Sequence, residues 1–307
     1  MSGRQSRFAP DRGLTSRMVL TMFLLGLLYV VLMAVLIGFL GTNSWPLVLV
    51  LGAAGLWAQW FFSDRVALAG LGGHEVTPQQ APELHAIIDR LCALADMPKP
   101  RVAVAETDLP NAFATGRSPS RAVVCVTTGI MRRLTRAELE GVLSHELSHV
   151  AHRDVTVMTV ASFVAVLAGF LTRSVMWSGM SGGGRGRENN NAAVAVLAVL
   201  VVSVVVYCLS FILIRTLSRY RELAADRAGA LLTGQPAVLA SALTKISGDL
   251  GGIPTRDLRE AEAYNAFFFT PAIAPGFSLS SIFATHPPIE QRLDQLGRIS
   301  REIGQGR

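Results

Sequence analysis

The segment His145-Glu146-Leu147-Ser148-His149 combines two imidazoles and a carboxylate in the HExxH order. On a helix, residues four positions apart share a face, so both histidines can reach one metal ion. Glu146 projects about 100° further round the helix, where it can take a proton from a water bound to that ion. The pattern predicts a zinc site with Glu146 as general base. The alternative is two surface histidines on an amphipathic helix.

A catalytic zinc needs a third protein ligand and an open position. None of the other histidines completes an HExxHxxGxxH pattern, so a glutamate is the best candidate. Glu222 closely follows an apolar stretch, and Asp226, four residues later, shares its helix face. Asp226 can accept the free N–H of a ligand histidine. The alternative for Glu222 and Asp226 is a solvated charge run, and the spacing alone does not exclude it.

Capping and strand patterns frame the HExxH segment. Thr135 with Glu138 is a capping box, which predicts a helix that carries the HExxH residues. Thr77 with Gln80 predicts a second helix that starts there. Short apolar runs at 101–105 and 122–127 predict strands, and Asn111-Ala112-Phe113-Ala114-Thr115-Gly116 between them is an edge strand or its turn. The soluble part is therefore expected to be mixed, mainly helical with a small sheet.

The composition indicates a membrane protein. Of 307 residues, 50% are apolar and only 16% are charged, whereas soluble domains carry about 25% charge. This excludes a disordered chain, a coiled coil and a disulfide scaffold. The three cysteines include no CxxC pair, which fits a reducing compartment.

Four apolar stretches are candidate membrane spans. They cover residues 18–40, 46–62, 155–172 and 192–214. A spanning helix needs about 20 residues, so the first and fourth are strong candidates and the others are near the lower limit. A buried helical hairpin is the alternative for 155–172.

The charges that flank these stretches predict the topology. Arginines at 4, 7, 12 and 17 place the N-terminus in the cytoplasm by the positive-inside rule, and the first stretch is too long for a signal peptide. Residues 1–62 and 155–214 would form membrane hairpins, and 63–154 and 215–307 would be cytoplasmic. The arginines at 173, 185 and 187 in the outer loop run against this topology. An even number of crossings places His145 and Glu222 on one membrane face.

Several motifs together resemble a known family. The chain resembles the HtpX group of the M48 zinc metallopeptidases, which are related to the CAAX prenyl endopeptidases. The matching segments are 111–116, 145–149, 153–154, 218–226 and Thr285-His286-Pro287-Pro288. With the four-span layout, the resemblance covers nearly the whole chain. It implies an α+β gluzincin-like protease domain with about four transmembrane helices.

The resemblance also implies roles for individual residues. His145, His149 and Glu222 would bind one Zn²⁺, Glu146 would be the general base and Asp226 would support a ligand. Asn111 and Ala112 would pair with the substrate backbone, although the segment could be a plain turn. His286 would hydrogen-bond the oxyanion, or would only cap the following helix, expected from 287 to 299. His74 and His85 are interpreted as surface residues, and no role is assigned to Asp154.

The resulting prediction is a zinc endopeptidase in the bacterial inner membrane, with its protease domain facing the cytoplasm. Its substrates would be misfolded or damaged membrane proteins, and the bilayer is an expected partner. A catalytically silent zinc-binding membrane scaffold is the alternative. A metal transporter is not favoured, because it would need polar or ionisable groups within the spans, and these spans contain almost none. The scattered basic residues do not indicate nucleic-acid binding, and no pattern indicates an oligomeric state.

Overall fold

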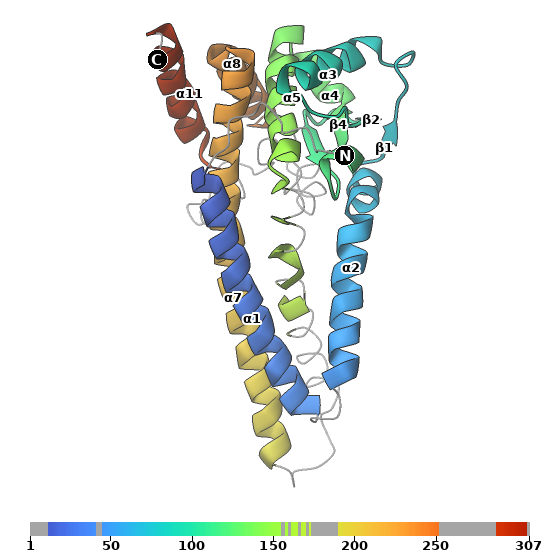
Figure 1. The fold of residues 1–307 in the computed structure, drawn as a ribbon, viewed down its shortest axis with the longest axis vertical. Coiled ribbons are helices and arrows are strands. Elements are labelled where there is room, and N and C mark those ends of the chain that lie inside the picture. Colours follow the sequence, from blue (N-terminus) through green and yellow to red (C-terminus); the bar gives the residue numbers. More distant parts are fainter. Residues whose placement is uncertain are drawn as a thin grey trace. The chain divides into compact units, whose positions relative to one another are not determined.

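The computed structural model describes residues 12–40, 45–154, 157–158, 161–164, 167–169, 172, 190–251 and 287–305. The chain divides into two compact units. The sheet unit comprises Met1–Leu14, Phe62–Thr156 and Ser218–Arg307, and the helical unit comprises Thr15–Phe61 and Val157–Leu217. Figure 1 shows their elements in ribbon form.

A four-stranded mixed sheet organises the sheet unit. Its strands are β1 (Gly73–Glu75), β2 (Arg101–Ala105), β3 (Ala112–Thr115) and β4 (Val123–Thr127). Their order is β1-β2-β4-β3, with β2 and β4 parallel and the other two pairs antiparallel. The predicted strands at 101–105 and 122–127 are confirmed, the second one residue shorter. The segment 111–116 contains β3, which lies at the edge of the sheet and, among the described strands, pairs with β4 alone.

Side chains alternate between the two faces of this sheet, as strand geometry requires. On one face, Val102 and Val124 join the main hydrophobic core with helix α3 (Pro82–Ala95) and helix α5 (Arg136–Ala151). On the other face, Ala103 and Cys125 pack with Ala67 of helix α2 (Trp45–Gly70). The sheet is therefore covered on both sides within its own unit.

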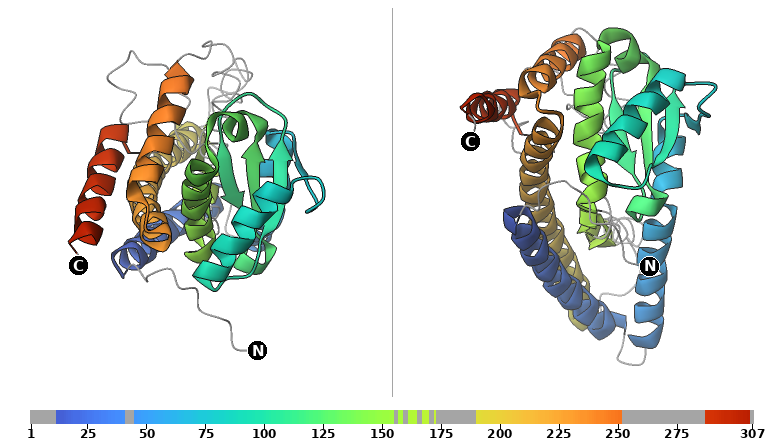
Figure 2. Two further views of the ribbon diagram at one scale, coloured as in Figure 1. Left: turned by 90° about the horizontal axis from the view of Figure 1, so that it is seen from above. Right: turned by 45° about the horizontal axis from the view of Figure 1, so that its top comes forward.

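Among the described residues, four further helices belong to the sheet unit. They are α4 (Thr128–Arg133), α8 (Pro236–Gly251), α11 (Ile289–Gly304) and the short 3₁₀ helix η2 (Pro119–Arg121). Helix α5 contacts β3, α3 and α8, and α8 contacts α11. Figure 2 shows α5 beside the sheet. Helix α5 is thus the central element, and it carries the HExxH residues.

The start of α5 is confirmed as predicted. The Thr135 hydroxyl accepts a hydrogen bond from the Glu138 N–H at 3.3 Å, and the Glu138 carboxylate accepts one from the Thr135 N–H at 2.9 Å. Two donors that a helix start leaves without intrahelical partners are satisfied in this way.

The predicted helix start at Thr77 is wrong. The Gln80 side chain accepts a hydrogen bond from the Thr77 N–H at 2.8 Å, but this closes a turn, and α3 begins only at Pro82. A helix that began at 78 would place Pro82 in its interior, where proline removes a hydrogen bond and clashes with the preceding turn. At the first helical position the same proline is tolerated.

Of the two histidines interpreted as surface residues, His74 is exposed and His85 is not. His85 is buried, and its Nε2 lies 3.0 Å from the Val76 carbonyl oxygen. Position 85 adjoins Leu84 on the apolar face of α3, which explains its burial.

The helical unit contains long apolar helices. Helix α1 (Arg12–Leu40) and helix α7 (Asn190–Thr233) include the first and fourth predicted stretches. Within the described residues, two segments are long and apolar enough to cross a membrane, namely Arg12–Gly38 and Val196–Thr233. The stretch 46–62 lies in α2, and 155–172 is described only in part, so four spans remain a prediction.

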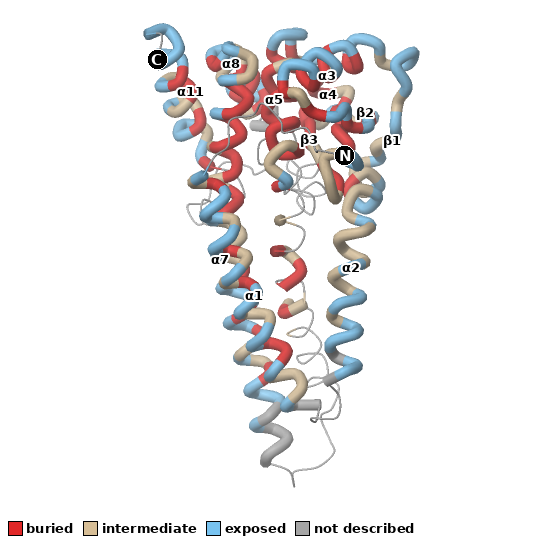
Figure 3. The backbone as a smooth tube through the Cα atoms, in the orientation of Figure 1, coloured by how far each residue is buried: buried red, intermediate tan, exposed pale blue. Residues whose placement is uncertain are grey.

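Burial differs sharply between the two units. In Figure 3, buried residues concentrate around α5 and the sheet, whereas most of α1 and the first part of α7 are exposed or intermediate. The exposed side chains are large and apolar, for example Phe23, Val30, Val201 and Ile212. Such a surface is stable against lipid and costly in water.

Candidate active site

Helix α5 positions the three residues of the HExxH motif inside the sheet unit. His145, Glu146 and His149 are all buried, and the two Nε2 atoms lie only 3.2 Å apart. One helical turn separates the two histidines, so their rings meet at one point, as the spacing predicts. The alternative of two surface histidines is therefore excluded.

Helix α7 brings Glu222 to the same point. Its Oε2 lies 3.5 Å from His145 Nε2, and its Oε1 lies 3.4 Å from His149 Nε2. One ligand atom from each of these three residues lies within 4.8 Å of the other two. Glu222 is only 5% exposed, so the alternative of a solvated charge run is also excluded.

A close approach of α7 to α5 makes this meeting possible. A Cβ atom on Gly229 would lie 2.8 Å from Ser144 Oγ and 2.9 Å from the His145 nitrogen. Positions 222, 226 and 229 follow the helical i, i+4, i+7 pattern and share one face. Glycine at 229 thus lets this face of α7 reach the turn that carries His145.

Each histidine is oriented by a carboxylate behind it. His145 Nδ1 donates to Asp226 Oδ1 at 2.9 Å, and His149 Nδ1 donates to Asp154 Oδ2 at 2.8 Å. Because an ionised carboxylate only accepts, the Nδ1 atoms carry the hydrogens, and the Nε2 atoms face inward, where a neutral ring offers its lone pair. Asp226 lies where the sequence analysis expects it. Asp154 does the same for His149, although no role was assigned to it.

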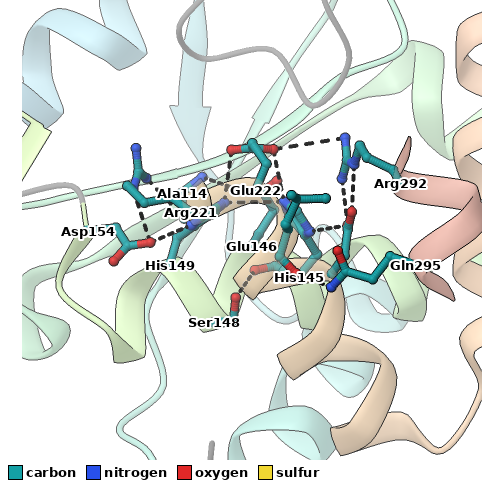
Figure 4. A network of polar contacts seen from close by, with 12 residues as sticks. Ala114, His145, Glu146, Ser148, His149, Asp154, Arg221, Glu222, Arg292 and Gln295 are labelled. Carbon is teal, nitrogen blue, oxygen red and sulfur yellow. Dashed lines mark hydrogen bonds and ion pairs between the residues drawn. The ribbon is translucent and has the colours of Figure 1, made fainter. Parts of the chain in front are cut away.

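Two buried arginines complete the network in Figure 4. Arg292 of α11 donates to Asp226 from Nε at 2.7 Å and from Nη2 at 2.6 Å. Arg221 of α7 contacts Asp154 through Nε at 3.1 Å. We call these two series of polar contacts the His145 relay (His145–Asp226–Arg292) and the His149 relay (His149–Asp154–Arg221).

Sequence analysis missed both arginines, although one left a signal. Arg292 falls on the apolar stripe of its helix, with Ile289, Leu296 and Ile299 at three- and four-residue spacing. An arginine at a core position is almost never buried without a charged partner. Arg221 gave no comparable signal in the sequence. Its partner Asp154 is 67 residues away in the chain, and only the fold brings the two together.

The charges of this cluster fit a divalent cation. With both histidines neutral, as metal ligands must be, four buried carboxylates (Glu146, Asp154, Glu222, Asp226) and two buried guanidiniums (Arg221, Arg292) leave two net negative charges. Isolated buried charge is expensive, and one divalent ion between inward-facing nitrogen and oxygen donors compensates it. Two imidazoles and a carboxylate are a zinc-type donor set. The residues present therefore fit the metal that the sequence predicts.

The same negative charge shifts the pKa of both imidazoles. Burial alone would lower the pKa of His145, but hydrogen bonds with Asp226 and Glu222 raise it above its usual value. Burial is likewise outweighed at His149, where Asp154 and Glu222 raise the pKa to about 9. Protons and a metal ion compete for these nitrogens.

Glu146 is held beside the ligand atoms by the sheet edge. Its Oε2 accepts a hydrogen bond from the Ala114 N–H of β3 at 3.0 Å. Burial raises the pKa of Glu146, and the neighbouring His145 and His149 offset this only in part. A carboxylate with a raised pKa is a stronger base than an ordinary one, which suits it to accept and return a proton.

The predicted substrate contacts, Asn111 and Ala112, lie at the start of this edge strand. Asn111 is buried, and its backbone pairs with Thr127: its N–H donates to Thr127 Oγ1 and its carbonyl accepts from the Thr127 N–H, both at 2.9 Å. Ala112, the first residue of β3, is also buried. Asn111 and Ala112 thus adjoin Ala114, which contacts the predicted base. His286 lies outside the described residues.

Fold and site together define a class: a membrane-associated metallopeptidase with an HExxH helix and a glutamate, Glu222, beside its two histidines. Comparison with known proteins agrees. Residues 78–300 match the model of "Peptidase family M48". The chain is 60% identical over 301 residues to "Protease HtpX homolog 1" of Streptomyces coelicolor, covering 98% of this chain and 97% of the relative. It is 54% identical over 298 residues to "Protease HtpX homolog" of Moorella thermoacetica, covering 97% and 98%.

A solved structure shares the fold. The crystal structure of S. mikatae Ste24p is similar with a TM-score of 0.53 at 15% sequence identity, over 93% of this chain and 67% of that one. The chain belongs to peptidase family M48, in which it resembles the HtpX proteases. It is accordingly a metallopeptidase that acts on polypeptides in association with a membrane.

Proposed function

We propose that this chain is a zinc endopeptidase of the bacterial inner membrane that cleaves misfolded or damaged membrane proteins on the cytoplasmic side. The observation that carries the proposal is the buried set of His145, His149 and Glu222, whose ligand atoms lie within 4.8 Å of one another. Both histidines have their Nδ1 atoms tied to carboxylates, which leaves Nε2 for the metal.

The proposed chemistry divides between the metal and the chain. Zinc, when held by these three ligands, supplies a Lewis acid that polarises the scissile carbonyl and lowers the pKa of water. Glu146 accepts the proton of the attacking water and later delivers it to the leaving amine. Its hydrogen bond from Ala114 holds the carboxylate at the sheet edge while it does so.

Further residues take supporting roles in this proposal. Asp226 orients His145, and the edge strand at Asn111 and Ala112 receives the substrate backbone as an added strand. His286 donates a hydrogen bond to the oxyanion. Substrate binding at β3 is supported by its position as edge strand and by its direct contact with Glu146.

The proposed orientation and substrates follow from the membrane helices. Arg12 and Arg17 lie at the start of α1, and Arg215 follows the apolar part of α7. The positive-inside rule places these ends at the cytoplasmic face. Two of the three segments of the sheet unit start at Phe62 and Ser218, at or shortly after the end of an apolar stretch in the sequence. A protease tethered in this way meets membrane proteins at the bilayer surface.

The test compares the wild-type protein with Glu146→Gln, both purified in detergent and loaded with zinc. Cleavage of an unfolded membrane protein, and of the enzyme itself, is followed at equal zinc content. We expect the variant to lose about 10²–10⁴-fold in rate, because proton transfer by a positioned base contributes that much. Equal zinc without cleavage in either protein would favour the silent scaffold. Equal cleavage by both would contradict the assignment of Glu146.

A further inference from the structure

Arg292 contacts two acidic residues of the metal centre from a separate helix. It is only 2% exposed, and its guanidinium donates two hydrogen bonds to Asp226. Its Nη1 also lies 3.9 Å from Glu222 Oε2. We propose that Arg292 is a positioning residue that sets the affinity of the metal centre and couples metal binding to the docking of helix α11. The proposal rests on the metal-binding role given to His145 and Glu222 above.

The guanidinium can act on both groups because of its shape and charge. Its planar fork matches a carboxylate in bidentate geometry, which fixes the plane of Asp226 and directs Oδ1 toward His145. Glu222 and Asp226 lie four residues apart on one helix face and are both buried, so their like charges repel. The guanidinium between them offsets this repulsion and permits both to stay ionised.

The coupling arises because three helices meet through this one side chain. His145 lies on α5, Glu222 and Asp226 lie on α7, and Arg292 lies on α11. Helix α11 is also attached by a hydrogen bond from Gln295 Nε2 to the Leu223 carbonyl at 2.7 Å. Leu296 and Ile299 of the same helix enter the main core. Docking of α11 therefore delivers the charge that the metal site needs, and a bound metal stabilises the docked helix in return.

The direct test measures zinc affinity by competition with a chromogenic chelator in Arg292→Gln, Arg292→Lys and Arg298→Gln. Arg298 is exposed on the same helix and serves as the matched control. We expect Arg292→Gln to bind zinc about 10–100-fold more weakly, the usual cost of removing a partner behind a metal ligand. Arg292→Lys should recover part of this loss, because it keeps the charge without the fork. Arg298→Gln should match the wild type.

A spectroscopic measurement distinguishes positioning from general stability. The visible absorption spectrum of the Co²⁺-substituted protein reports ligand geometry, and it should change in Arg292→Gln but not in Arg298→Gln. Wild-type zinc affinity together with a wild-type cobalt spectrum in Arg292→Gln would overturn the proposal.

Hydrogen exchange of the wild-type protein provides a test that needs no variant to fold. Zinc should slow amide exchange in α11 as well as in α5. Identical exchange of α11 with and without zinc would overturn the coupling. None of these measurements requires turnover. If Arg292→Gln changes zinc binding but the wild type cleaves no peptide, the proposed protease function is contradicted and this inference stands. If the wild type cleaves peptides but Arg292→Gln changes neither zinc affinity nor the cobalt spectrum, the protease function stands and this inference is contradicted.

Discussion

The two relays have the same chemical order but differ in how the chain builds them. In the His149 relay, Asp154 lies only five residues after His149, just beyond the end of the same helix. In the His145 relay, Asp226 comes from 81 residues further along the chain, and Arg292 follows it by another 66. The His149–Asp154 pair is local, whereas the complete His145 relay requires α5, α7 and α11 to pack together.

The relays also differ in the strength of their outer contact. Arg292 donates two short hydrogen bonds to Asp226, whereas Arg221 contacts Asp154 through Nε at 3.1 Å. In both, burial would raise the pKa of the aspartate, but the nearby guanidinium and the histidine lower it. Both aspartates are thus ionised partners, and the His145 relay is the more tightly bound.

The largest effect is expected from removing the aspartate charges. Asp226→Asn removes the carboxylate that accepts both short hydrogen bonds of the buried Arg292, and breaking a buried pair costs about 3–5 kcal/mol. Asp154→Asn should cost less, about 1–3 kcal/mol, because it removes a single ion pair and one hydrogen bond. Denaturant unfolding of the metal-free proteins in detergent measures both. Equal losses would show that the relays are equivalent and would contradict the comparison.

A smaller effect is expected at the contact that brings α7 to His145. Gly229→Ala introduces a Cβ atom 2.8 Å from Ser144 Oγ, and such overpacking costs about 1–3 kcal/mol. It should also weaken zinc binding, since Glu222 shares the displaced face. Gly141→Ala in α5 is the matched control, because its Cβ would lie 3.5 Å from Leu239, an ordinary contact. If Gly229→Ala were as stable and bound zinc as well as Gly141→Ala, the close approach would not matter.

The smallest effect concerns an acidic residue of α5 outside both relays. Burial would raise the pKa of Glu138, but hydrogen bonds from Lys245, Ser241 and Thr135 lower it from 4.5 to about 2. Because the pKa is depressed in the folded protein, its stabilisation is present above pH 4.5 and is lost as the pH falls toward 2.

Thermal unfolding against pH measures this contribution. We expect at most about 1 kcal/mol, because Lys245 is half exposed and solvent screens the pair. Glu138→Gln should remove this part of the acid sensitivity. Lys245→Gln should raise the pKa of Glu138 and so shift the acid transition toward pH 4.5. An unchanged acid transition in Glu138→Gln would place the sensitivity elsewhere, including in the relays.

Local patterns predicted much of what the structure contains. The capping box at Thr135, the strand at 101–105, the edge strand within 111–116 and the helix that carries Glu222 and Asp226 all occur where expected. Each depends on interactions within a few residues. The helix start at Thr77 was wrong because Pro82 overrides the local cap, and the C-terminal helix runs over Ile289–Gly304, where 287–299 was expected.

By itself, the sequence determined the chemistry of this protein, because HExxH places two imidazoles and a carboxylate through the fixed geometry of one helix. It also determined the apolar helices, which depend on composition and length alone. Only the tertiary structure decided that Glu222 lies beside both histidines. It also decided that Asp154 contacts His149 and that Arg221 and Arg292 pair with the two aspartates. Those contacts join separate helices, and a buried charge shows its partner only when the packing that desolvates it is known.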